Sequence, residues 1–385
     1  MKKPYLLLTL VVVITFIGGF FAGIFYSKIN ANEDYSKTLK IENAPKSAIK
    51  PEQKTLPNPA KSKVLIGYVQ DFRDPNVVDY AKLTHVIFSF AHPKMDGGIL
   101  LNGDSALKNL RAMVLKAKKY KTKVILAVGG WYNIQGGESY KYFKTAISNP
   151  VSRTKLANEL SGIATREKLG GIDIDFEYPR STADAHNLTA FAKELSDKLH
   201  PQGKELSIAV YSEINAATET EMTAVIYEPA IFQLVDHVNI MAYDGQWDGK
   251  YNAANLSPYP FSEKVVNYWS HLFETHNLPK DKLVLGVPLY AQPENQASKQ
   301  ASIGAIINKN PANAESDTVS MNGTIYHYNG KATMIKKTKL ALDHGFGGMM
   351  MWEVGQDAKG TNSLTGTIAD ALKESANQYV VTSKK

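Results

Sequence analysis

The strongest constraint on the fold is a set of short apolar runs that recur at intervals along most of the chain. These runs are nearly continuous, and they are rich in Val, Ile, Leu and Met. They occupy residues 64–68, 86–90, 124–128, 172–176, 206–210, 238–241, 283–287 and 349–352. Runs of this kind are typical of parallel strands that are covered on both faces.

The intervals between the runs carry the apolar spacing of helices. Apolar residues recur three or four positions apart within 107–117, 156–164, 188–195 and 269–273. Strands that alternate with helices over about 310 residues predict an α/β fold, a (β/α)8 TIM barrel spanning residues 63–378. A doubly wound open sheet is the alternative, but no GxGxxG motif follows the first strand.

The fourth run contains a row of acids. Asp173, Asp175 and Glu177 alternate with Ile174 and Phe176, so a strand would place all three carboxyls on one face, about 6–7 Å apart. Crowded carboxyls disfavour one another's ionisation, and one held protonated near neutral pH can act as a general acid. Two other interpretations are that the acids line the solvent-exposed face of an antiparallel strand or that they bind calcium. The run is flanked by apolar residues and lacks the glycine turn of a calcium loop, so it favours catalysis.

Other polar and aromatic residues follow the ends of the predicted strands. In a TIM barrel these ends form one rim, and active sites lie on that rim. The candidates are Tyr68, Phe90, Gly130, Trp131, Tyr178, Met241, Tyr243, Asp244, Tyr290 and Trp352. Each aromatic residue alone is more often part of a core, but together on one rim they indicate a cleft that stacks sugar rings.

The amino-acid composition excludes some kinds of metal site and argues against a nucleic-acid partner. The chain has no cysteine, which excludes disulfides and thiolate metal sites, and its nine histidines form no HExxH motif. We therefore expect no metal and no cofactor. The net charge of +7 is concentrated in the terminal segments, so we expect no nucleic-acid partner.

The N-terminal segment predicts that the protein is anchored to a membrane or exported. Lys3 and Lys28 bracket 24 uncharged residues, which is long enough to span a bilayer. Residues 1–27 are therefore predicted to be a transmembrane anchor or a cleaved signal sequence, with a buried core helix as the third interpretation. Residues 28–62 read as a disordered, flexible linker, and residues 379–385 as a C-terminal tail. We expect an extracytoplasmic protein, anchored to the membrane by this segment or secreted.

The motifs on the strands resemble those of the glycoside hydrolase family 18 chitinases, of the bacterial type. The family pattern DxxDxDxE is matched at Asp173, Asp175 and Glu177. SxGG is matched at Gly129 and Gly130, MxYD at residues 241–244, and the tryptophan of the eighth strand at Trp352. The resemblance covers residues 64 to about 375, with motifs on seven of the eight strands.

This resemblance implies a chitinase-like enzyme that cleaves β-1,4 linkages between N-acetylglucosamine units of chitin or chitooligosaccharides. Its mechanism would be retaining and substrate-assisted, an exception to the two-carboxylate scheme. Glu177 would be the general acid, Asp175 would orient the substrate acetamido group, Tyr243 would hold the acetamido oxygen, and Asp173 would share a proton with Asp175. The remaining rim residues would bind the polysaccharide or oligosaccharide.

The chain also departs from the family pattern. Ala127 replaces the serine of SxGG, so Tyr68 alone is expected to support Asp173, and Ala127→Ser is expected to raise kcat. Gly170 replaces the first acid of the motif. The short segment 291–331 is predicted to leave the cleft shallow. An endo-β-N-acetylglucosaminidase acting on N-glycan cores and a non-catalytic sugar-binding barrel are the alternative functions.

Overall fold

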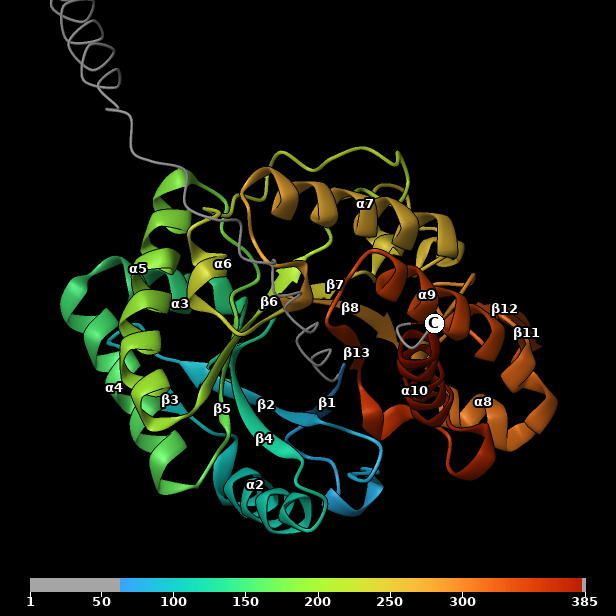
Figure 1. Ribbon diagram of the computed structural model, residues 1–385, viewed down its shortest axis with the longest axis horizontal. Coiled ribbons are helices and arrows are strands. Elements are labelled where there is room, and N and C mark those ends of the chain that lie inside the picture. Colours follow the sequence, from blue (N-terminus) through green and yellow to red (C-terminus); the bar gives the residue numbers. More distant parts are fainter. Residues whose placement is uncertain (1–62, 383–385) are drawn as a thin grey trace, which may run out of the picture. The chain divides into compact units, whose positions relative to one another are not determined.

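The computed structural model describes residues 63–382, where eight parallel strands close into a barrel surrounded by helices (Figure 1). The strands follow the order β1-β13-β8-β7-β6-β5-β4-β2, and β2 pairs with β1 to close the ring. They are β1 (Val64–Gln70), β2 (His85–Pro93), β4 (Lys123–Gly129), β5 (Gly171–Asp175), β6 (Glu205–Tyr211), β7 (His237–Met241), β8 (Leu283–Pro288) and β13 (Gly348–Trp352). Each coincides with one of the apolar runs, so the prediction of a (β/α)8 barrel is confirmed.

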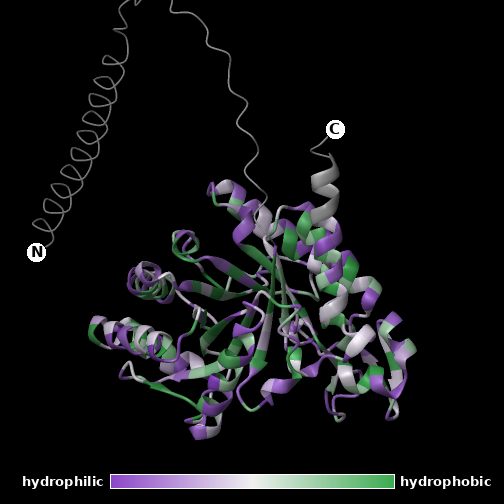
Figure 2. Ribbon diagram, turned by 60° about the horizontal axis from the view of Figure 1, so that its bottom comes forward, coloured by the Kyte–Doolittle hydropathy of each residue, from purple (hydrophilic) through white to green (hydrophobic). Residues whose placement is uncertain are grey.

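Helices cover the outside of the barrel, and their hydrophobic and hydrophilic residues are interspersed along each helix (Figure 2). They are α2 (Gly103–Lys118), α3 (Ser139–Ser148), α4 (Pro150–Arg166), α5 (Thr182–Leu199), α6 (Ile231–Leu234), α7 (Tyr259–Thr275), α9 (Lys331–Asp343) and α10 (Leu364–Thr382). The four predicted helical stripes lie in α2, α4, α5 and α7. In α2, for example, Leu110 and Met113 are buried, one turn apart.

The two helices on either side of β5 begin at well-formed caps. The Asn149 side chain accepts from the Val151 N–H, and Pro150 occupies the first position of α4. At the start of α5, Ser181 Oγ accepts from the Asp184 N–H at 3.2 Å. The Ser181 cap ends the loop that follows β5 and carries Glu177.

The barrel has two separate cores. One lies between strands and helices and includes Ile172 and Ile174 of β5. The other lies inside the barrel, where Ile66, Ile125 and Met350 belong to one buried cluster. Because side chains alternate along a strand, the outward isoleucines of β5 leave its aspartates inside the barrel, as the sequence predicted.

Smaller elements decorate the barrel. The strand β3 (Ile99–Leu100) pairs antiparallel with β2. A separate four-stranded antiparallel sheet follows β8, accompanied by α8 (Ile303–Lys309). Its strands are β9 (Tyr290–Pro293), β10 (Ala301–Ser302), β11 (Thr318–Met321) and β12 (Thr324–His327). These strands are two to four residues long, too short to give a periodic signal in the sequence.

The predicted anchor, residues 1–27, and the predicted linker, residues 28–62, lie outside the described residues, as does the end of the tail, 383–385. The membrane segment, the domain boundaries and the extracytoplasmic location therefore stay predictions. Among the helices within 63–382, none combines the length and apolarity that crossing a bilayer requires.

Candidate active site

A cleft of about 1050 Å³ opens at the carboxyl ends of the barrel strands. Most of the predicted site residues line it: Tyr68, Phe90, Trp131, Asp175, Glu177, Tyr178, Met241, Tyr243, Asp244 and Trp352. Asp173, Gly130 and Tyr290 are not among the lining residues. They lie behind the cleft surface and act on the residues that form it, as the contacts below show.

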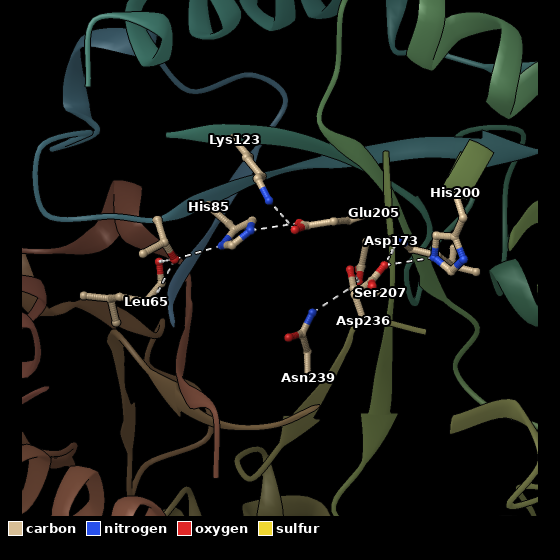
Figure 3. A network of polar contacts seen from close by, with 11 residues as sticks. Leu65, His85, Lys123, Asp173, His200, Glu205, Ser207, Asp236 and Asn239 are labelled. Atoms are coloured by element: carbon tan, nitrogen blue, oxygen red, sulfur yellow. Dashed lines mark hydrogen bonds and ion pairs between the residues drawn. The ribbon is translucent and has the colours of Figure 1, made fainter. Parts of the chain in front are cut away.

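Asp173 is fully buried beneath the cleft and accepts hydrogen bonds from three side chains. Tyr68 Oη donates to Oδ2 at 2.8 Å, while Ser207 Oγ donates to Oδ1 at 2.5 Å and Asn239 Nδ2 at 3.2 Å. Figure 3 shows Ser207 and Asn239 beside this carboxyl. The expectation that Tyr68 supports Asp173 alone is therefore wrong. Ser207 lies opposite Asp173 in the β5–β6 register and supplies the hydroxyl that Ala127 lacks.

All three acids of the row hold their protons more tightly than free carboxyls do. Burial raises the pKa of Asp173 to about 6. Burial, and then the charges of Glu177 and Asp173, raise the pKa of Asp175 well above its usual range. Burial, followed by the charges of Asp244 and Glu138, raises the pKa of Glu177 to about 7. The row can therefore keep a proton near neutral pH, as general acid catalysis requires.

One carboxylate oxygen of this row is available to a ligand. Asp175 Oδ1 is buried and has no hydrogen-bond partner within residues 63–382. A buried acceptor without a partner is costly, and Asp175 lines the cleft. This oxygen is therefore suited to accept an N–H or O–H from a bound molecule.

Across the cleft, the loop after β7 holds Tyr243 and Asp244. Asp244 has a left-handed backbone, with φ of 66°. Its Oδ1 accepts from Tyr290 Oη at 2.6 Å and from Gln246 Nε2 at 3.0 Å. Tyr290 thus holds Asp244 from behind the cleft rather than lining it, so the structure does not support direct substrate contact by Tyr290.

Aromatic rings form the base of the cleft. The rings of Phe90 and Trp352 are stacked, with centroids 5.8 Å apart, and Tyr68 lies 5.7 Å from Trp352. Gly130 has φ of 79°, and a Cβ there would lie 2.8 Å from the Phe90 ring. A Cβ on Gly129 would lie 2.0 Å from the Asp175 carbonyl oxygen. Glycine is therefore needed at both positions, at Gly130 by the Phe90 ring and at Gly129 by the backbone at the end of β5.

The structure adds residues that the sequence interpretation missed. The side chains of Phe72, Tyr132 and Trp247 line the cleft and are 62%, 58% and 61% exposed, as is Trp131 at 56%. Exposed apolar side chains that gather in one groove are typical of a binding surface. Trp247 lies three residues after the MxYD match, so its proximity to that motif could have identified it as a candidate site residue.

The fifth barrel strand, for which the sequence suggested no site residue, also contributes. Tyr211, the last residue of β6, lines the cleft, and its Oη donates to Asp248 Oδ1 at 3.4 Å. Asn215 and Met222, from the loop after β6, line one side. Residues 291–331 contribute no residue to the lining of the cleft, and the shallowness of the cleft stays a prediction.

Comparison with known proteins gives consistent similarities. The family model described as Glycosyl hydrolases family 18 matches residues 64–357. Probable chitinase 10 of Drosophila melanogaster is 29% identical over 57% of the chain, and Endochitinase 1 of Metarhizium robertsii is 24% identical over 76%. The alignments cover 10% of the Drosophila protein and 80% of the Metarhizium protein. The alignment with a chitinase-like effector of Moniliophthora roreri covers 56% of that effector.

Solved structures share the fold. The GH18 chitinase ChiB from the chitin utilization locus of Flavobacterium johnsoniae aligns with a TM-score of 0.67 and 25% identity, over 82% of this chain and 95% of that one. A chitinase from Bacteroides thetaiotaomicron aligns with a TM-score of 0.68 and 24% identity, over 82% and 97%. The second similarity is evidence of fold alone.

Proposed function

The chain belongs to glycosyl hydrolases family 18, and we propose that it hydrolyses the β-1,4 linkages of chitin and chitooligosaccharides with retention of anomeric configuration. The proposal is supported by the family match, by relatives named as chitinases, and by the chemistry of the cleft. The observation that carries it is the row of three acids, with a free Asp175 oxygen beside Glu177 under a cleft lined by aromatic rings.

Binding rests on the aromatic base and on Asp175. Trp352 lies at the base, where the flat apolar face of a sugar ring can stack on it. Asp175 Oδ1 accepts the N–H of the 2-acetamido group of the sugar above it, which gives this buried oxygen the partner that it lacks. Sugars that carry only a hydroxyl at C2 have no acetamido N–H for this contact and no acetamido oxygen to attack C1.

The reaction then uses the substrate's own acetamido group as the nucleophile. Glu177 gives its proton to the glycosidic oxygen while the bond from that oxygen to C1 breaks. The acetamido oxygen forms a new bond to C1, which gives an oxazolinium ion, and the Tyr243 hydroxyl holds that oxygen in place. Water then adds to C1 from the opposite face while the bond from C1 to the acetamido oxygen breaks, and the water returns a proton to Glu177. The two inversions leave the product in the β configuration.

Asp173 and its three donors support this step from below. As Asp175 accepts the acetamido N–H, a proton shared between the two aspartates shifts toward Asp175 and leaves charge on Asp173. Hydrogen bonds to a charged group are stronger than neutral ones. Tyr68, Ser207 and Asn239 therefore stabilise Asp173 most when the oxazolinium forms.

Product analysis tests the proposal. Purified protein is incubated with N-acetylglucosamine hexamer and, separately, with a high-mannose glycopeptide. Glu177→Gln, which cannot donate a proton, serves as the matched control and should be slower by about 10²-fold or more. We expect the wild type, but not Glu177→Gln, to convert the hexamer into shorter chitooligosaccharides. Cleavage of the glycopeptide alone would favour an endo-β-N-acetylglucosaminidase, and binding without cleavage would indicate a non-catalytic barrel.

A further inference from the structure

Three metal-ligating side chains meet at the end of the barrel opposite the cleft. His85, Glu205 and His237 are the first residues of β2, β6 and β7. One ligand atom from each lies within 4.8 Å of the other two. We propose that these three residues, here called the lower cluster, bind a divalent transition-metal ion, with zinc as the best match.

His85 is already held as a metal ligand would be. Its Nε2 lies 2.9 Å from Glu205 Oε2, so the two potential ligand atoms face each other (Figure 3). Its Nδ1 lies 2.8 Å from Thr84 Oγ1, which also accepts from the Leu65 N–H at 2.9 Å. Metal-binding histidines commonly use their second ring nitrogen in this way, since the outer bond fixes the ring.

His237 provides the second, independent observation. Its Nδ1 is buried and has no hydrogen-bond partner within residues 63–382. The ring packs edge-on against His85, with centroids 5.2 Å apart. A buried ring nitrogen without a partner calls for an explanation, and a metal ion, or a water bound to one, would provide its missing contact.

The donor set and spacing suit zinc. Two imidazoles and a carboxylate, with a water in the fourth position, are an established set for this ion. Ligand atoms on a tetrahedral zinc ion lie about 3.3 Å apart. His85 Nε2 and Glu205 Oε2 are close to that spacing, and small side-chain rotations would bring His237 within reach.

Lys123 limits the affinity of the lower cluster for a metal ion. Its ammonium group pairs with the other oxygen of Glu205, Oε1, whereas Oε2 faces His85, so the ammonium group does not occupy the proposed ligand atom. The positive charge of Lys123 nevertheless opposes a cation at this position. The Lys123 side chain is 49% exposed and can turn toward solvent.

Binding would connect opposite sides of the barrel. β2 pairs with β1 and β4, whereas β6 and β7 pair with each other, so the cluster joins β2 to two strands that are not its neighbours. The proposed ion would therefore stabilise the fold rather than act in the reaction. The sequence contains no compact motif for this site, because the three ligands are widely separated along the chain and meet only when the barrel closes.

Thermal unfolding and cobalt spectroscopy test the proposal on tag-free protein stripped of metal by a chelator. Zinc at about 50 µM should raise Tm by at least about 2 °C. Cobalt(II) should give the visible absorption of a four-coordinate site. His237→Gln should lose both responses. His200→Gln should keep both, because the His200 ring contacts Ser196 and Asp236, each at 3.0 Å, and is not a member of the lower cluster.

Lys123→Met separates a metal site from a purely structural ion pair. If the cluster binds metal, removing this charge should tighten zinc binding by about threefold or more. If the cluster is only an ion pair, the variant should lose stability with no change in the response to zinc. The proposal is overturned by that second result, by absence of zinc binding to the wild type, or by unchanged binding in a folded His237→Gln.

Discussion

At the scale of single residues, the chemistry of the cleft depends on where the acids keep their protons. Glu177 can protonate a leaving group only while it is itself protonated. Burial raises its pKa to about 7, and its charge, after burial, helps to raise the pKa of Asp175, so these protons do not titrate independently. The rate of the reaction should therefore report the titration of the whole row.

The first prediction is a loss of activity on the alkaline side. The protonated form is the active one, so kcat/KM for a chitooligosaccharide should fall as pH rises through about 7. Rates measured at constant ionic strength from pH 4 to pH 10 would show this. A flat profile up to pH 9 would contradict the assignment of Glu177 as the acid.

The second prediction concerns the support of Asp173. Ser207→Ala removes a hydrogen bond to a carboxyl that carries charge during the reaction, so kcat should fall by roughly 10- to 100-fold with little change in KM. Ala127→Ser is the paired variant. Since Ser207 already fills that role, the added hydroxyl should change kcat by less than about twofold. A large gain from Ala127→Ser would show that Ser207 does not provide this support.

The same residues show what sequence could and could not predict at this scale. Because side chains alternate along a strand, the sequence predicts that Asp173 and Asp175 point to the same face. In the structure both are buried on the face opposite to Ile172 and Ile174. The roles of Ser207 and Asn239 follow from the register between strands and from contacts across the barrel interior. A single sequence does not specify that register, so these partners were missed.

At the scale of elements, the end of β4 shapes the base of the cleft. The third prediction is that Gly130→Ala displaces the Phe90 ring, and with it the stack on Trp352, because the new Cβ would lie 2.8 Å from that ring. KM should rise by roughly tenfold, since the stacking surface for the sugar is lost.

Gly203→Ala is the matched control for this prediction. Gly203 also has a positive φ, 67°, but no atom lies within 4 Å of its Cβ position. Both variants carry a similar backbone strain of about 1 kcal/mol. Equal effects on KM would mean that strain, rather than the position of Phe90, is responsible.

The strands themselves were predictable because each barrel strand is covered on both faces and is therefore apolar throughout. The helices α3, α6 and α8 and the small sheet after β8 are among the elements that the sequence did not predict. α6 has four residues and the strands β9 to β12 have at most four each, so no period can develop within them.

At the scale of the whole molecule, the cleft is bounded by loops from several strands but receives no lining residue from 291–331. The fourth prediction is that an open cleft binds the polymer anywhere along its length and cuts internally. The viscosity of a soluble chitin derivative should fall early, before much reducing sugar is released. Dimers as the sole product from the first time point would instead indicate processive action from a chain end.

The most direct test of the central claim is the configuration of the first product. N-acetylglucosamine hexamer is cleaved inside an NMR tube, and the anomeric proton is followed before mutarotation. Because the acetamido group attacks first and water second, we predict that the new reducing end appears as the β anomer and then equilibrates. Initial release of the α anomer would contradict substrate-assisted retention.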